Sequence, residues 1–365
     1  MHTHALERIK PGLRVAGPDS IELPTGYRIE PVVQNLNYPS AISWDADQNM
    51  LIAESGFPRG RWAQSEVRIL RRDRHGVLST VASGFEPPLN DITVHDGVLY
   101  VSHRGKISAV EDGAIRDLIT DLPSWGLHQN NTLVFGPDER MYFGQGTGST
   151  AGVVDPAALM QLRSANRPSG HDIPGATVVL TGKNLTSRDP ETGQSETTGA
   201  FLPWGMPSMP GQRIAGVQPG QAASGSIMSA RFDGSDLRVF AWGLRNPFGL
   251  VFGSGLRLFV TNQGARPLEP RPIASDNDTL WVLEEGRWYG WPDYYGGTAV
   301  TDPSFKQPGG QPTEFLVANH EELLAPHASP PKPVMDLGQH VGASKLDFCL
   351  HPEFGFPNQA FVAEF

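Results

Sequence analysis

The chain has 365 residues, and its 29 Lys and Arg against 39 Asp and Glu give it a formal net charge of -10. A general nucleic-acid binder more often has a basic surface, so we expect no nucleic-acid partner. The single cysteine excludes an internal disulfide. No apolar run reaches the roughly 18 residues that indicate a transmembrane helix, so no membrane span is expected. The length suits one large all-β domain or two ordinary domains.

The first segment, residues 1–21, is expected to be an N-terminal extension. It lacks the apolar stretch of a signal peptide, so the sequence as it stands has no recognisable leader. Either the protein is cytoplasmic or the sequence begins after a leader that has been removed. The next segment, "TGYRIEPVVQNL" at residues 25–36, is predicted to be a strand.

One pattern then recurs along the chain: an alternating apolar run, a short turn of Asp, Gly or Asn, a second apolar run, and a polar end. It begins at Pro39, Asn90, Asn131, Phe248 and Ser344. Period-two runs separated by such turns predict β-hairpins. The first three hairpins start about 40 to 50 residues apart, which is typical of the blades of a β-propeller.

Two further hairpins and two interruptions complete the expected organisation. Residues 224–243 should turn at Asp233-Gly234, and residues 278–292 should turn at Glu285-Gly286. The segments 152–223 and 293–332 break the rhythm and are expected to be long insertions at the surface. Insertions on one rim of a propeller commonly build or cover a site.

The sequence therefore predicts an all-β, six-bladed β-propeller as a single domain over residues 22–365, with about four and a half blades visible. It stops inside the fifth hairpin, and a closed propeller that stopped there would leave an exposed sheet edge. We therefore expect a chain that is incomplete at its C-terminus, with the strand at 25–36 closing the last blade.

Two loops carry the residues of greatest chemical interest. In "WGLHQNNTLVFGPDERMYFGQGTGS", His128 precedes a predicted strand and is either a catalytic base or an ordinary loop histidine. In "GLRNPFGL", Arg245 and Asn246 also precede a strand, where a loop faces the channel of a propeller. An arginine there either binds a carboxylate or an oxyanion, or ties blades together through backbone carbonyls.

These motifs occur in an order that resembles a known family. "HQNNTLVFGPDERMYFGQGTG", "GLRNPFGL", "FVTNQGA" and "DNDTLWVLEEGRWYGWPDYYGG" together resemble the soluble glucose/sorbosone dehydrogenase family. The resemblance runs from residue 38 to 365 and is strongest over 242–292. Members are six-bladed propellers that oxidise aldoses with pyrroloquinoline quinone and calcium. The resemblance implies a small sugar substrate, a separate electron acceptor and a periplasmic or secreted location, while a cytoplasmic one stays open.

The resemblance also implies roles for individual residues. His128 would be the base that takes the proton from the sugar C1 hydroxyl as hydride passes to the quinone. Arg245 would stabilise negative charge on the quinone oxygen, with Asn246 beside the cofactor. The backbone carbonyls of Gly264 and Ala265 would bind calcium, an ion that prefers oxygen ligands and would anchor the cofactor.

Further residues complete this interpretation. Asn90 and Gln129 are candidates for substrate contact, and Asp278 is either an additional calcium ligand or a solvated turn residue. Leu127 stands where the family often has an acidic residue. The family's cofactor-binding lysine and arginines would fall after Phe365, which would leave the chain as given unable to hold the cofactor tightly and could leave it inactive.

Two other functions stay open at this point. A metal-dependent propeller lactonase would use Glu54, Asn90, Asn131 and an aspartate in the channel, all near strand ends. A non-catalytic propeller that binds a ligand or a protein is equally compatible with the fold, because this architecture serves many roles.

Overall fold

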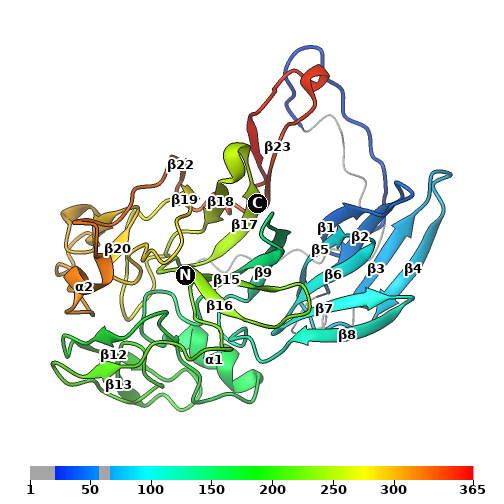
Figure 1. The fold of residues 1–365 in the computed structure, drawn as a ribbon. Helices are drawn as coiled ribbons and strands as arrows, with labels where there is room; N and C mark the ends of the chain where they lie inside the picture. The colour runs from blue at the N-terminus through cyan, green and yellow to red at the C-terminus, as the bar shows by residue number, and fades with distance from the viewer. Residues whose placement is uncertain (1–20, 57–65, 365) are drawn as a thin grey trace, which may run out of the picture.

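The protein is an all-β, propeller-like assembly of four-stranded antiparallel sheets, each of which is a blade (Figure 1). The computed structural model describes residues 21–56 and 66–364. In blades 1 and 2 the strands follow one another in chain order. The strands of blade 1 are β1 (Pro39–Trp44), β2 (Met50–Glu54), β3 (Arg68–Arg72) and β4 (Leu78–Ser83). Those of blade 2 are β5 (Leu89–His95), β6 (Val98–His103), β7 (Lys106–Glu111) and β8 (Ala114–Ile119).

Blades 3 and 4 have the same antiparallel pattern but long connections inside them. The strands of blade 3 are β9 (Asn130–Phe135), β10 (Arg140–Gln145), β15 (Ser226–Arg231) and β16 (Arg238–Trp242). Those of blade 4 are β17 (Pro247–Phe252), β18 (Leu258–Asn262), β19 (Asp278–Val282) and β22 (Met335–Gly338). The 3-10 helix η3 (Ser254–Leu256) lies in the turn between β17 and β18.

A two-stranded sheet of β23 (Leu346–Phe348) and β24 (Ala360–Val362) follows blade 4. The five recurring hairpins and the hairpin at 224–243 are confirmed. Four four-stranded blades are present among the described residues, and the count of six stays a prediction.

The first strands of successive blades contact one another, from β1 to β5, β9, β17 and β23. Apolar side chains fill the space between neighbouring blades, as Leu51 and Ala53 of blade 1 do with Leu89 and Ile92 of blade 2. The second strands β2, β6 and β10 bury side chains on both faces because neighbouring blades cover them, which explains their short, strongly apolar runs. The outermost strands β4 and β8 are largely exposed. The loops that lead into the first strands are thereby brought to one end of the assembly.

The predicted hairpin at 278–292 is wrong. β19 pairs with β22, more than fifty residues later, and not with the segment that follows the Glu285-Gly286 turn. Trp288 instead forms an isolated parallel bridge with Trp242 and is 1% exposed. Burial of this large indole ring stabilises the observed path of the chain.

The predicted strand at 25–36 is also absent from the described residues. The Tyr27 ring packs against Phe354 and Phe356, with centroids 5.6 and 5.5 Å apart. Phe354 ends the 3-10 helix η5 (Pro352–Phe354), which lies between β23 and β24. Pro31 lacks the N–H that a strand ladder needs, so aromatic packing rather than strand pairing holds this segment. The rest of the expected extension, residues 1–20, lies outside the described residues.

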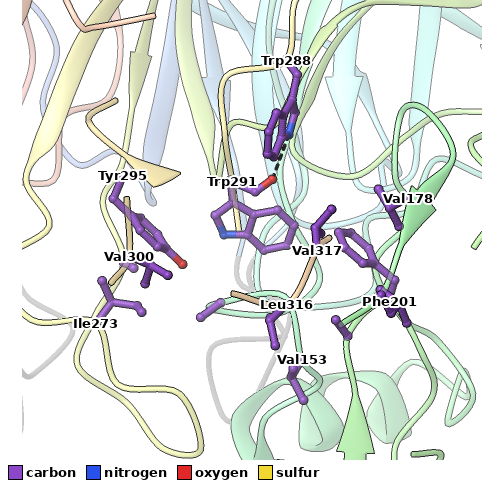
Figure 2. Packing of buried hydrophobic residues seen from close by; sticks show 14 of the residues in the cluster. Val153, Val178, Phe201, Ile273, Trp288, Trp291, Tyr295, Val300, Leu316 and Val317 are labelled. Atoms are coloured by element: carbon purple, nitrogen blue, oxygen red, sulfur yellow. Dashed lines mark hydrogen bonds between the residues drawn. The ribbon is translucent and has the colours of Figure 1, made fainter. Parts of the chain in front are cut away.

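The long connections of blades 3 and 4 form a second apolar core (Figure 2). Between β10 and β15 the chain forms α1 (Pro156–Ser164), β11 (Val178–Val179), β12 (Asn184–Arg188), β13 (Ser195–Gly199) and β14 (Arg213–Ile214). Between β19 and β22 it forms β20 (Tyr294–Tyr295), β21 (Thr298–Ala299), η4 (Pro303–Phe305) and α2 (His320–Leu324). Val178 and Phe201 from the first connection pack with Trp291, Leu316 and Val317 from the second. The two connections are thus packed together and do not extend separately over the surface.

A buried ion pair reinforces this second core. Arg271 Nη2 donates to Asp293 Oδ1 at 2.8 Å, and Arg271 Nη1 donates to the carbonyls of Ala151 and Pro292. The Asp293 carboxylate also accepts from the backbone N–H groups of Leu316 and Val317. These bonds join both connections and satisfy the buried charges, as buried ions require. Of the helices within residues 21–56 and 66–364, none has the length and apolar character to cross a membrane.

Candidate active site

A cavity of about 380 Å³ lies where the loops of blades 3 and 4 meet. Its lining comes from the loop before β9, the connection after β10, the β16–β17 loop, the loop after β18 and the loop after β22. The lining residues are Leu127, His128, Thr150, Ala157, Arg245, Gln263, Gly264, Arg266, Leu268, Asp278, His340 and Gly342. Small-molecule sites occupy about 300 to 1,000 Å³, so this cavity has room for a small ligand.

The loop of His128 is held against the glycine-rich end of β10. The backbone N–H of His128 donates to the carbonyl of Thr147 at 3.1 Å, and that of Leu127 donates to the carbonyl of Gly148 at 3.0 Å. A Cβ at Gly146 would lie 2.3 Å from the Cβ of His128 and 2.6 Å from Asn246 Oδ1. Only glycine at this position allows the histidine and the next blade to approach so closely.

The hydrogen bonds of His128 fix its tautomer. Nδ1 lies 2.9 Å from the Thr147 carbonyl oxygen, which can only accept, so Nδ1 carries the proton and donates. Nε2 is then the unprotonated nitrogen. Burial, followed by the positive charges of Arg245 and Arg266, holds the pKa of His128 well below its usual value. The imidazole is therefore neutral at neutral pH, as a general base must be.

Arg245 joins the loops around the cavity and also lines it. Nε donates to the Thr150 carbonyl at 3.1 Å, and Nη1 donates to the Gly264 carbonyl at 2.8 Å. Burial lowers the pKa of Arg245, while the nearby carboxylate of Asp276 opposes that shift. Nη2 makes no hydrogen bond to a described residue. The guanidinium thus ties loops of the two blades together through backbone carbonyls, as one of the two interpretations expected. Binding of a carboxylate or an oxyanion by its other edge stays a prediction.

Asn246 lies behind the cavity wall. Its Nδ2 donates to Gln263 Oε1 at 2.8 Å, and its Oδ1 accepts from Asn131 Nδ2 at 2.9 Å. Gln263, which the sequence did not single out, lines the cavity in its place. In the sequence, its position directly before Gly264 could have indicated that Gln263 lies at the site. The cofactor contact of Asn246 stays a prediction.

Of the expected calcium ligands, Gly264 and Asp278 line the cavity, whereas Ala265 is fully buried beside Gly264. Asp278 accepts from the backbone N–H groups of Gly264 at 2.9 Å and Ala343 at 2.8 Å. Asp276 accepts from the N–H of Ala265, and burial raises the pKa of Asp276 to about 7, although that hydrogen bond opposes the shift. The carbonyl of Gly264 already accepts from Arg245, so a calcium ion would compete with a fixed cation for that oxygen. The calcium roles of Gly264, Ala265 and Asp278 stay predictions, and no step below depends on them.

The two candidate substrate contacts lie outside the cavity lining. Asn90 Nδ2 donates to the Asn130 carbonyl at 2.8 Å and so ties blade 2 to blade 3. The amide of Gln129 faces the carbonyls of Gly126 and Leu127 at 3.5 Å. The Asn90 amide is thus bonded to the neighbouring blade and the Gln129 amide within its own loop, and their contact with substrate stays a prediction.

The residues expected of a lactonase are engaged elsewhere. Glu54 accepts from Arg68 Nε and from the N–H of Asn37, both at 2.6 Å. Asn131 donates to Asn246 and to the Pro247 carbonyl. Among residues 21–56 and 66–364, no three His, Cys, Asp or Glu side chains are grouped so that they could hold a metal ion. The geometry does not favour this function.

Three residues that line the cavity had been given no role on the basis of the sequence. Arg266 is exposed at the rim and forms no hydrogen bond or ion pair through its side chain with a described residue. The hydroxyl of Thr150 is buried without a hydrogen-bond partner. His340 has a positive φ of 54° and reaches the cavity from the loop after β22.

Comparisons with known proteins agree with the fold. No family model matches the chain, and no curated protein matches it significantly. Among solved structures it is similar to the soluble aldose sugar dehydrogenase of Escherichia coli, with a TM-score of 0.53, 13% identity, and coverage of 90% of this chain and 80% of that one. It is also similar to the PQQ domain of pyranose dehydrogenase from Coprinopsis cinerea, with a TM-score of 0.55, 16% identity, and coverage of 94% and 75%. The resemblance to this group, stated above from motifs, therefore holds at the level of the fold.

Proposed function

We propose that the protein is an oxidoreductase that oxidises an aldose-type sugar at C1, with pyrroloquinoline quinone as the hydride acceptor and His128 as the general base. The observation that carries the proposal is the meeting of His128 and Arg245, from neighbouring blades, at one cavity. The likeness in fold to sugar dehydrogenases supports the choice of reaction.

His128 is set up to receive a proton. Its Nδ1–H is committed to the Thr147 carbonyl, so Nε2 is the nitrogen available to take the proton of the C1 hydroxyl. The lowered pKa keeps the ring neutral before the reaction. A positioned general base of this kind typically accelerates a reaction by about 100- to 10,000-fold.

The cavity suits an anionic cofactor. Pyrroloquinoline quinone carries three carboxylates and, when bound, would supply the hydride acceptor. Arg245 has a guanidinium edge with no hydrogen bond to a described residue, and it would bind an oxygen of the cofactor. Its other edge is held by the Thr150 and Gly264 carbonyls, so the charge is fixed in place before any ligand binds.

The test is reconstitution of the purified protein. Pyrroloquinoline quinone is added with and without calcium, and reduction of an artificial electron acceptor is followed over a panel of aldoses. We expect a change in the quinone absorption spectrum on binding and sugar-dependent turnover. An absence of both across the panel would contradict the proposal.

A lactone panel without quinone addresses the alternative hydrolase. Ring opening that requires a divalent metal and is lost in Glu54→Ala would support the lactonase and remove the oxidoreductase proposal. Glu54 is bonded to Arg68, so the folding of this variant must be verified by its melting temperature.

A further inference from the structure

The cavity differs in charge from the rest of the chain. The chain as a whole carries a net charge of -10, yet the charged residues that line the cavity are Arg245, Arg266 and Asp278. Both carboxylate oxygens of Asp278 accept backbone N–H groups, from Gly264 and from Ala343. The two arginines therefore give the cavity a net positive charge, which favours a ligand with negative charge.

Of the two arginines that line the cavity, Arg266 is the one whose guanidinium makes no hydrogen bond or ion pair with a described residue. The backbone before it is fixed, because the N–H of Gly264 bonds Asp278 and the N–H of Ala265 bonds Asp276. Its side chain is exposed at the rim and pairs with no carboxylate among the described residues. By contrast, Arg163 and Arg68 each bind carboxylates directly. A permanently charged guanidinium with no partner at the edge of a cavity is suited to bind a carboxylate or a phosphate.

The surroundings of Arg266 place it near the reacting end of the cavity. Arg266 and His128 line the same cavity, and the positive charge of Arg266 contributes to the lowered pKa of His128. Leu127, beside His128, gives the wall there an apolar side chain instead of a carboxylate that would repel an anion.

We infer that the sugar bound in this cavity carries an anionic group, a carboxylate as in a uronic acid or a phosphate as in an aldose phosphate, and that Arg266 binds it. This inference rests on the proposed function for the identity of the ligand as an aldose. Arg266 then determines specificity, because a neutral aldose would leave the guanidinium unpaired at the rim.

Direct binding tests the inference without requiring turnover. Titration calorimetry would compare glucuronate, glucose 6-phosphate and glucose at equal ionic strength, with and without saturating pyrroloquinoline quinone. A hydrogen bond to a charged group contributes about 1.5 to 3 kcal/mol, so we expect the preferred anionic sugar to bind roughly 10- to 100-fold more tightly than glucose. Tighter binding of glucuronate would identify a carboxylate as the charged group, and tighter binding of glucose 6-phosphate would identify a phosphate.

The variant Arg266→Gln should remove that preference. Because Arg266 is exposed and unbonded, the variant is expected to fold normally. The matched control is Arg74→Gln, an exposed arginine in the turn between β3 and β4, which should retain the preference. Equal binding of glucose and both anionic sugars, no binding of either anion, or a preference that survives in Arg266→Gln would overturn the inference. A preference that disappears once quinone is bound would assign Arg266 to the cofactor and overturn it as well.

Measuring sugar oxidation distinguishes a failure of this inference from a failure of the proposed function. Oxidation of neutral aldoses without any preference for charged ones would leave the function standing and remove the inference. Preferential binding of an anionic sugar, dependent on Arg266 but never followed by quinone-dependent oxidation, would sustain the inference as a binding property and remove the oxidoreductase.

Discussion

Blades 1 and 2 differ from blades 3 and 4 in how their strands are connected. In the first pair, β1 to β8 follow one another in sequence and pair with their neighbours. In the second pair, the strand pattern is the same, but long segments separate β10 from β15 and β19 from β22. The candidate site lies only on the interrupted pair. The blade pattern thus supplies a scaffold, and loops at the strand ends of blades 3 and 4 supply most of the cavity lining, to which the long connection of blade 3 adds Thr150 and Ala157.

The largest expected effect is the loss of the proposed general base, His128, in the loop that leads into blade 3. His128→Gln should lower turnover of the reconstituted enzyme by about 100- to 10,000-fold, because the general base is removed. The melting temperature should change little, and the matched control His351→Gln, an exposed residue outside the cavity, should leave turnover unchanged. Turnover within twofold of the parent protein in steady-state assays would remove His128 from the mechanism.

The next effect concerns the buried ion pair of the two connections. Arg271→Met leaves the fully buried Asp293 carboxylate without its guanidinium partner and with His320 Nε2, 3.0 Å away, as the side chain beside it, and should lower the free energy of unfolding by about 3 to 5 kcal/mol. Lys183→Met breaks the exposed pair with Glu314 in the same region and should cost at most about 1 kcal/mol. Denaturant titration of both variants measures the difference, and equal costs would show that Asp293 is compensated without Arg271.

A smaller effect is expected in blade 2, where His103 should make the free energy of unfolding depend on pH. Burial, opposed by the charge of Asp117, lowers the pKa of His103 to about 4. Its contribution to stability is fully present above the ordinary pKa of about 6.5 and is lost as pH falls through the folded value near 4, which amounts to about 3 kcal/mol. His103→Gln should therefore lose less stability than the parent between pH 6.5 and 4. Parallel pH profiles of unfolding for both proteins would contradict this.

The smallest effect is expected at the outer edge of blade 2. Arg116 and Glu111 form an exposed pair with an N–O distance of 3.3 Å. Arg116→Gln should change the free energy of unfolding by less than about 1 kcal/mol, because solvent screens the charges. A larger loss, measured by denaturant titration, would mean that blade 2 depends on surface charge rather than on its apolar core.

The local alternation of apolar and polar residues predicted the hairpins of the blades, and individual hairpins show why. The hairpins that begin at Pro39, Asn90 and Asn131 join strands that are neighbours in both sequence and sheet, so alternation and turn residues specify them. The hairpin at 278–292 failed because the true partner of β19 lies at Met335–Gly338. No local signal in the sequence indicates a partner that distant.

The candidate site was predicted in part for the same reason. His128 and Arg245 precede strands, and the propeller pattern places such loops at one end. Thr150, Arg266 and His340 reach the cavity from three separate connections, and nothing in their immediate sequence distinguishes them from surface residues. Asn246 stands next to Arg245 in the sequence, yet its hydrogen bonds to Gln263 and Asn131 hold it behind the wall.

By itself, the sequence determined the all-β class, the recurring hairpins and the two loops that contribute His128 and Arg245, because alternation and turn chemistry act over a few residues. Only the tertiary structure decided that the connections of blades 3 and 4 share a core around Trp288 and Trp291, and that Arg266 joins the cavity. Those outcomes depend on apolar burial and charge pairing between segments far apart in the chain, which no local pattern encodes.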